Sequence, residues 1–134
     1  MCTGIRGAQI IDDTYNANPA SLRAALCVLA TAAGEKWVVL GDMGELGPEA
    51  REMHEQLGRE ARELGIDRLY ALGPLAAAAA RGFGARGQSY TDIDVLNDAL
   101  AAGLDSNVTV LVKGSRFMRM ERVTAALGGE HETC

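Results

Sequence analysis

The sequence predicts an α/β domain with a mainly parallel sheet of about five strands and helices on both faces. Short runs of β-branched and aliphatic residues alternate with longer stretches rich in Ala, Leu, Glu and Arg. This alternation is typical of a parallel sheet whose strands are connected by helices. With 134 residues and no internal repeat or linker, the chain has the size of one domain with a substantial core.

The first half of the chain contains two strand–helix units. An apolar run predicts a strand at residues 9–12, and Trp-Val-Val-Leu predicts another at residues 37–40. A proline opens each of the predicted helices, which span residues 19–33 and 48–64. Leucines at helical spacing support the first of them: Leu22, Leu26 and Leu29.

The second half continues the alternation with three further strands and three further helices. The strands are predicted at residues 68–72, at residues 88–90, where the pattern is weak, and at residues 108–112, where it is clearest. The helices are predicted from Pro74, over residues 92–104 and over residues 115–127.

Right-handed crossovers would wind these five units into a Rossmann-like sheet. We expect one domain over residues 1–134, with its core at about residues 9–127 and a frayed tail at residues 128–134. Ligands of such folds bind beyond the carboxyl ends of the strands. Three loops are therefore candidates for the site, at residues 12–21, 41–48 and 113–116.

Composition limits the classes of function. A formal charge of -5 argues against a general nucleic-acid binder, which needs a basic surface. The three cysteines, Cys2, Cys27 and Cys134, form no CxxC pair and predict neither a disulfide framework nor a zinc site. Because the sequence also shows no membrane-spanning run and no signal peptide, we expect a cytoplasmic protein with no membrane partner.

The loop at residues 12–21 is unusually polar. Asn18 can cap the following helix, with Pro19 at its first position, and this reading is purely structural. Capping does not account for two adjacent acids, a tyrosine and a second asparagine. Those types suit a nucleoside, because a carboxylate binds ribose hydroxyls, amides bind polar edges and a ring contacts the base. Both readings stay open.

The loop at residues 41–48 contains three glycines, which permit a tight turn, and two acids, Asp42 and Glu45. Solvated acids in a long turn are the favoured interpretation. His54 follows in a highly charged helix and has no triad partner nearby in the sequence. We therefore expect a surface histidine rather than a catalytic base.

The loop at residues 113–116 follows the clearest strand. With Ser115 as a helix cap between Lys113 and Arg116, it is either an anion site at a helix N-terminus or an ordinary cap with solvated basic neighbours. The GFGARG segment at residues 82–87 matches GxGxxG but follows a helix, which is the wrong context for pyrophosphate. The chain contains no Walker A sequence either.

Three motifs together resemble the signatures of the Mur ligase family. They are IDDTYNANPAS at residues 11–21, VLGDMGELG at residues 39–47 and VKGSR at residues 112–116. They occur in the order and spacing of the family, and the resemblance extends from about Ile10 to Leu127. The first motif is similar to that of the branch that adds D-alanyl-D-alanine (D-Ala-D-Ala) to UDP-MurNAc-tripeptide in peptidoglycan synthesis.

This resemblance implies a Rossmann-like C-terminal domain that closes over ATP and helps to position the amino substrate. In such ligases ATP phosphorylates a peptide carboxylate, the amine of D-Ala-D-Ala attacks the acyl phosphate, and an amide forms with release of ADP and phosphate. The implied nucleotide-binding residues are Asp13, which would contact the ribose, and Tyr15, Asn16 and Asn18. The implied substrate-binding residues are Lys113, Ser115 and Arg116.

The resemblance also implies what the chain lacks. The family's N-terminal and central domains precede this region, and the central domain mainly holds ATP and Mg²⁺. We therefore expect no metal ligands and no catalytic residues in this chain, and no activity of the chain alone. The alternatives are another Mur-type ligase domain, a folylpolyglutamate-type ligase domain, or a stand-alone, non-catalytic binding module.

Overall fold

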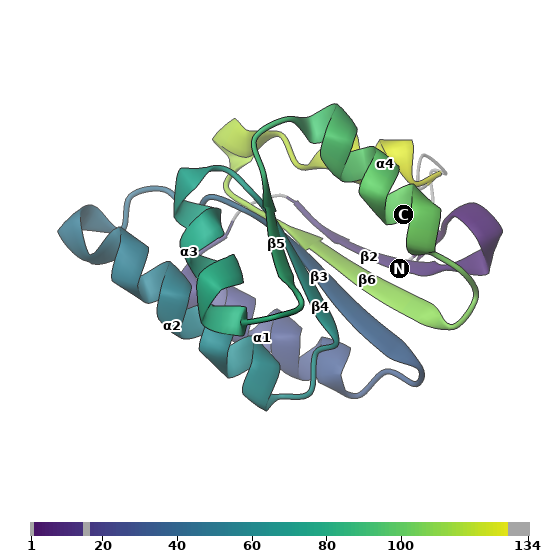
Figure 1. The fold of residues 1–134 in the computed structure, drawn as a ribbon, viewed down its shortest axis with the longest axis horizontal. Coiled ribbons are helices and arrows are strands. Elements are labelled where there is room, and N and C mark those ends of the chain that lie inside the picture. The colour runs from purple at the N-terminus through teal and green to yellow at the C-terminus, as the bar shows by residue number, and fades with distance from the viewer. Residues whose placement is uncertain (1, 15–16, 129–134) are drawn as a thin grey trace.

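The computed structural model describes residues 2–14 and 17–128, which form a six-stranded sheet. Helices cover this sheet (Figure 1). The strand order is β1-β2-β6-β3-β4-β5. Five strands are parallel, and β1 pairs antiparallel with β2 at the edge. The strands are β1 (Cys2–Thr3), β2 (Gln9–Asp13), β3 (Glu35–Gly41), β4 (Arg68–Leu72), β5 (Gly87–Tyr90) and β6 (Val108–Lys113).

Helices cover both faces of the sheet, which confirms the predicted Rossmann-like α/β class. Figure 1 shows α1, α2 and α3 on one face and α4 on the other. The helices are α1 (Pro19–Ala30), α2 (Ala50–Glu63), α3 (Pro74–Phe83), α4 (Ile93–Gly103) and α5 (Glu121–Ala126). Three short 3₁₀ helices are η1 (Ile5–Gly7), η2 (Gly47–Glu49) and η3 (Arg116–Met118).

Alternating side chains of the central strands build two separate cores. In β3, Val38 and Leu40 face the core beneath α1, α2 and α3, whereas Trp37 and Val39 face the core beneath α4 and α5. All six residues of β6, between β2 and β3, are buried. A strand that is buried on both faces reads as a continuous apolar run, which is why residues 108–112 were the clearest strand in the sequence.

Two elements differ from the sequence prediction. The two-residue strand β1 was missed, because so short a run carries no periodicity. The predicted helix at residues 115–127 is broken into η3 and α5. Arg119 adopts a left-handed conformation between them, with φ of 52°, and the next residue, Met120, is fully buried. The chain therefore turns there to place Met120 in the core.

Helices α2 and α3 approach each other closely through glycines. A Cβ atom at Gly58 of α2 would overlap the carbonyl oxygen of Ala79 in α3. A Cβ atom at Gly82 of α3 would likewise overlap the carbonyl oxygen of Glu55 in α2. The two helices therefore meet backbone to backbone. Buried hydrophobic residues run from Ala8 to Leu127 in the described part of the chain, and residues 129–134 of the predicted frayed tail lie outside the described residues.

Candidate functional site

Asp13 and Lys113 form an ion pair at the carboxyl ends of neighbouring strands. They are register partners in β2 and β6, and Lys113 Nζ donates to Asp13 Oδ2 at 2.7 Å. The Lys113 side chain is 1% exposed, whereas that of Asp13 is 42% exposed. From the sequence, Lys113 was expected either at an open anion site or in solvent. The solvated position is wrong, because the structure buries this ammonium group beside a carboxylate of the chain itself. A contact of Lys113 with a substrate anion stays a prediction.

Asn18 caps α1, as its residue type predicted. Its side chain accepts a hydrogen bond from the Ser21 backbone N–H at 2.9 Å, and the Ser21 hydroxyl accepts one from the Asn18 backbone N–H at 3.1 Å. Pro19 occupies the first helical position. The capping interpretation is thus confirmed for Asn18, while a nucleotide contact of this residue stays a prediction. Tyr15 and Asn16 lie outside the described residues.

Asp42, directly after β3, is a tertiary helix cap. Its side chain Oδ1 accepts a hydrogen bond from the backbone N–H of Ala76 at 2.7 Å, in the first turn of α3. The residue at the N-cap position of α3, Gly73, has no side chain to serve that turn. The expectation of a solvated acid is therefore wrong for Asp42, which is 6% exposed, although it holds for Glu45, which is exposed.

His54 is fully buried, so the expectation of a surface histidine is wrong. Its Nε2 accepts a hydrogen bond from the Met43 backbone N–H at 3.0 Å, and its Nδ1 lies 2.7 Å from the carbonyl oxygen of Ala50. The sequence contained a signal for this burial. The buried positions of α2 recur at helical spacing and define its inner face: His54, Leu57, Gly58 and Ala61.

Ser115 links the loop after β6 to the loop after β3. Its hydroxyl accepts a hydrogen bond from the Gly44 backbone N–H at 2.8 Å, and its own N–H donates to the Asp42 carbonyl oxygen at 3.2 Å. It makes no side-chain cap bond, and only the short η3 follows. The predicted side-chain cap is therefore wrong, whereas the predicted binding of an anion by this loop stays a prediction. A substrate contact of Ser115 is untested by this geometry and stays a prediction.

The three loops meet around an open hollow of about 750 Å³. Of the predicted site residues, Asn18, Ser115 and Arg116 line it together. The apolar part of the wall was not predicted from the sequence, and it includes Phe117, which is 65% exposed. An exposed ring in an otherwise polar segment has no distinctive sequence signal. The full lining is Ala17, Asn18, Gly44, Glu45, Leu46, Ser115, Arg116 and Phe117.

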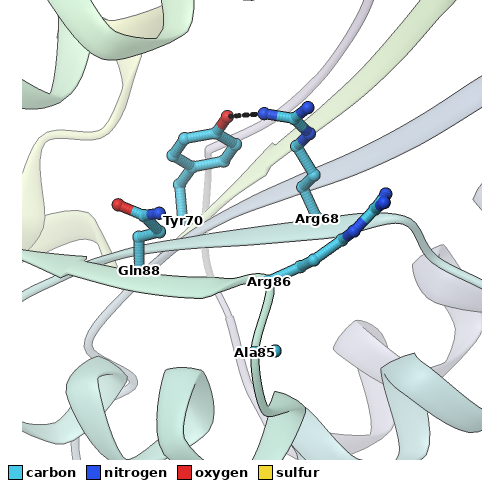
Figure 2. A pocket seen from close by; sticks show the side chains of 5 residues that line it. All are labelled: Arg68, Tyr70, Ala85, Arg86 and Gln88. Carbon is cyan, nitrogen blue, oxygen red and sulfur yellow. Dashed lines mark hydrogen bonds between the residues drawn. The ribbon is translucent and has the colours of Figure 1, made fainter.

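A second, smaller hollow of about 200 Å³ lies at the amino ends of β4 and β5 (Figure 2). The Arg68 guanidinium group lies 5.1 Å from the centre of the Trp37 ring and donates to the Tyr70 hydroxyl at 3.4 Å. The Tyr70 hydroxyl raises the pKa of Arg68 most, and burial opposes this. Figure 2 shows Arg86 extending away from Tyr70. The two cations do not converge, so this hollow is not a candidate anion site.

Residues 2–14 and 17–128 lack two further features. No helix in this part of the chain is long and apolar enough to cross a membrane. The same residues contain no group of three or more His, Cys, Asp or Glu side chains that could hold a metal ion.

The parallel sheet and the three converging loops are features that this chain shares with a known protein family. A family model described as Mur ligase, glutamate ligase domain, matches residues 1–116, and the chain therefore belongs to the Mur ligase family. It matches the C-terminal domain of these ligases.

The chain is also similar to individual members of this family. The chain is 40% identical over 127 residues to the UDP-N-acetylmuramoyl-tripeptide--D-alanyl-D-alanine ligase of Escherichia coli, covering 93% of the chain and 28% of that enzyme. MurF of Thermotoga maritima, solved in complex with ADP, superposes with a TM-score of 0.79 at 29% identity, covering 95% of the chain and 31% of that protein. MurF of Acinetobacter baumannii gives a TM-score of 0.76 at 37% identity, covering 93% and 29%. The chain thus spans less than a third of each relative.

Proposed function

We propose that this chain is the C-terminal domain of a longer, ADP-forming ligase that adds D-Ala-D-Ala to UDP-MurNAc-tripeptide in the cytoplasm during peptidoglycan synthesis. The observation that carries the proposal is the convergence of the three loops that bear the family-like motifs. Asn18, Gly44 and Ser115, one from each loop, line one hollow at the carboxyl edge of the sheet. This edge is where ligands bind in folds of this type.

The nucleotide side of the proposed site begins at Asp13. Its carboxylate is anchored by Lys113 and still 42% exposed, so a ribose hydroxyl can donate to a charged acceptor of fixed position. Tyr15, Asn16 and Asn18, in the loop that follows, would border the nucleotide. The complex of the Thermotoga maritima relative with ADP supports nucleotide use by this class.

The substrate side of the proposed site is the part of the hollow lined by Ser115 and Arg116. Arg116 would bind a carboxylate of the dipeptide or of the UDP-linked peptide, because a guanidinium group binds carboxylates in a bidentate manner. Ser115 and the buried Lys113 would act on this side by holding the loop and the strand end in place.

ATP phosphates and Mg²⁺ would be held elsewhere in the complete ligase. The sequence contains no Walker A loop, and residues 2–14 and 17–128 provide no cluster of metal-ligating side chains. The residues of this chain therefore fit the ribose and the substrate carboxylates better than the phosphate-bound metal. Mg²⁺ would stabilise charge on the transferring phosphoryl group in the other domains.

The decisive experiment compares the 134-residue chain with the complete protein that carries it. Each is incubated with ATP, Mg²⁺, UDP-MurNAc-tripeptide and D-Ala-D-Ala, and ADP release and product mass are measured. We expect ligation by the complete protein only. Activity of the chain alone, or a complete protein that accepts L-glutamate but not D-Ala-D-Ala, would contradict the proposal, and binding without any ligation would favour a non-catalytic module.

A further inference from the structure

We infer that His54 is a positioning residue for the hollow: held as a neutral ring, it fixes the backbone of the loop at residues 42–46. This inference rests on the proposed function for the role of the hollow. It does not depend on that function for the hydrogen bonds themselves. His54 lies in α2 and does not line the hollow, so it would act through the loop rather than on a ligand.

The partners of the ring determine its protonation. A carbonyl oxygen only accepts hydrogen bonds, so the 2.7 Å contact with the Ala50 carbonyl requires the proton on Nδ1. A backbone N–H only donates, so the 3.0 Å bond from Met43 requires an unprotonated Nε2. Only one form of imidazole, the neutral Nδ1–H tautomer, satisfies both partners.

The loop that His54 holds connects the core to the hollow. The Met43 side chain is fully buried in the core beneath α1, α2 and α3, and its backbone N–H is bound by His54. The next N–H, that of Gly44, is bound by Ser115. Two successive backbone amides are therefore anchored to different elements, and residues 44–46, which line the hollow, directly follow the bond to His54.

Packing alone does not explain a histidine at this position. The inner face of α2 is otherwise apolar or small, and a leucine would satisfy a purely hydrophobic contact there. Burying an imidazole is unfavourable unless both of its nitrogens find partners. One of these partners is a backbone amide of the loop. The loop contains no helix or strand between β3 and η2, so no regular secondary structure holds that amide. The imidazole therefore supplies its hydrogen-bond acceptor.

Two matched variants of the full chain separate positioning from packing. His54→Leu keeps an apolar side chain of similar size but removes both hydrogen bonds. His54→Gln keeps a side-chain oxygen that can accept from Met43. We expect amide hydrogen exchange of Met43 and Gly44 to become about tenfold faster in the Leu variant, which corresponds to the loss of one typical hydrogen bond, and to stay near the wild-type rate in the Gln variant.

The wild-type chain gives an independent measurement, because long-range ¹H–¹⁵N spectra report the tautomer directly. We expect the Nδ1–H form at neutral pH. A protonated ring, the Nε2–H tautomer, or unchanged exchange in a folded Leu variant would overturn the inference. If the Leu variant does not fold, the wild-type spectrum and the Gln variant still decide, since a Gln variant with fast Met43 exchange would also contradict it.

The complete ligase tests whether the loop held by His54 affects substrate binding. We expect His54→Leu to raise at least one substrate KM about threefold or more, with a smaller change in kcat, and His54→Gln to restore the KM. Loosened loop amides with unchanged KM values for all three substrates would overturn the link between loop and hollow. A complete protein that never ligates D-Ala-D-Ala would instead refute the proposed function, while the tautomer and exchange data would still stand.

Discussion

The Asp13–Lys113 pair is asymmetric, because water reaches the carboxylate but hardly reaches the ammonium group. Asp13 is 42% exposed and Lys113 is 1% exposed. A carboxylate left behind at the surface is solvated, whereas a buried ammonium group that loses its carboxylate partner stays desolvated. The two partners of one ion pair therefore have different importance for stability.

Removing each partner in turn measures this asymmetry. We expect Asp13→Ala to lower the free energy of unfolding by about 2–3 kcal/mol, between typical values for surface and buried pairs. Lys113→Met, which preserves an apolar stem of similar length, should lower it by about 1 kcal/mol or less. Urea denaturation of both variants gives the two values, and equal losses would show that the burial of Lys113 has no energetic consequence.

At the scale of elements, Asp42 stabilises a helix that lies 32 residues further along the chain. Ala76 N–H has its capping acceptor in the Asp42 side chain. We expect Asp42→Ala to lower the free energy of unfolding by about 1–2 kcal/mol, the range typical of lost N-caps. Asp42→Asn retains a side-chain oxygen and is the matched control. If both variants melt like the wild type, the cap is energetically irrelevant.

Helices α1 and α2 are joined by a pH-sensitive ion pair. Arg23 Nε donates to Glu60 Oε1 at 2.8 Å, and this hydrogen bond lowers the pKa of Glu60 below its ordinary value. Because the folded state lowers this pKa, the stabilisation is present above the ordinary carboxyl pKa and is lost as the pH falls through the lowered pKa.

The comparison with Glu60→Gln tests this dependence. At pH 7 the wild type should be more stable by about 0.5–1 kcal/mol, since the pair is partly exposed. The difference should disappear as the pH falls below the lowered pKa of Glu60, where this carboxyl group is protonated in both the folded and the unfolded state. Chemical denaturation across this pH range measures it. A stability difference that grows toward low pH would contradict the assigned direction of the pKa shift.

The strands were more predictable than the helices. The strand predicted at residues 68–72 matches β4 residue for residue, because its apolar run is ended locally by Gly73 and Pro74. The helix predicted at residues 115–127 failed, because Met120 enters the core and forces a turn at Arg119. Helical spacing of apolar residues cannot reveal a break that tertiary packing imposes.

In the candidate site, too, local features were predictable from the sequence and long-range contacts were not. The cap at Asn18 was predictable, since its partner Ser21 is only three residues away. The roles of Asp42 and His54 were not predicted, although both depend on specific hydrogen bonds. Asp42 bonds an amide 34 residues away, and the His54 ring meets a loop on the far side of η2. Such partners are set by the fold as a whole, and residue type alone suggested solvated groups.

At the scale of the whole molecule, the two cores share one sheet and should unfold together. Trp37 lies in the core beneath α4 and α5, so its fluorescence reports that face, whereas far-ultraviolet circular dichroism reports helices of both faces. We expect the two probes to give coincident denaturation curves. Fluorescence and circular dichroism midpoints that differ clearly would show that the two faces unfold independently.

The backbone contact between α2 and α3 has a consequence for sequence variation. Glycine within a helix is ordinarily a weakness, and its replacement by alanine improves helix propensity by roughly 1 kcal/mol. At Gly58 and Gly82 the added methyl group has no space, because a carbonyl oxygen of the opposite helix already occupies it. Substitution by better helix formers is therefore not tolerated at these two positions, whereas the exposed Val28 and Val95 can vary freely. A family-wide search for tolerated substitutions, or a stabilising design, should treat the two glycines as fixed by geometry rather than by chemistry.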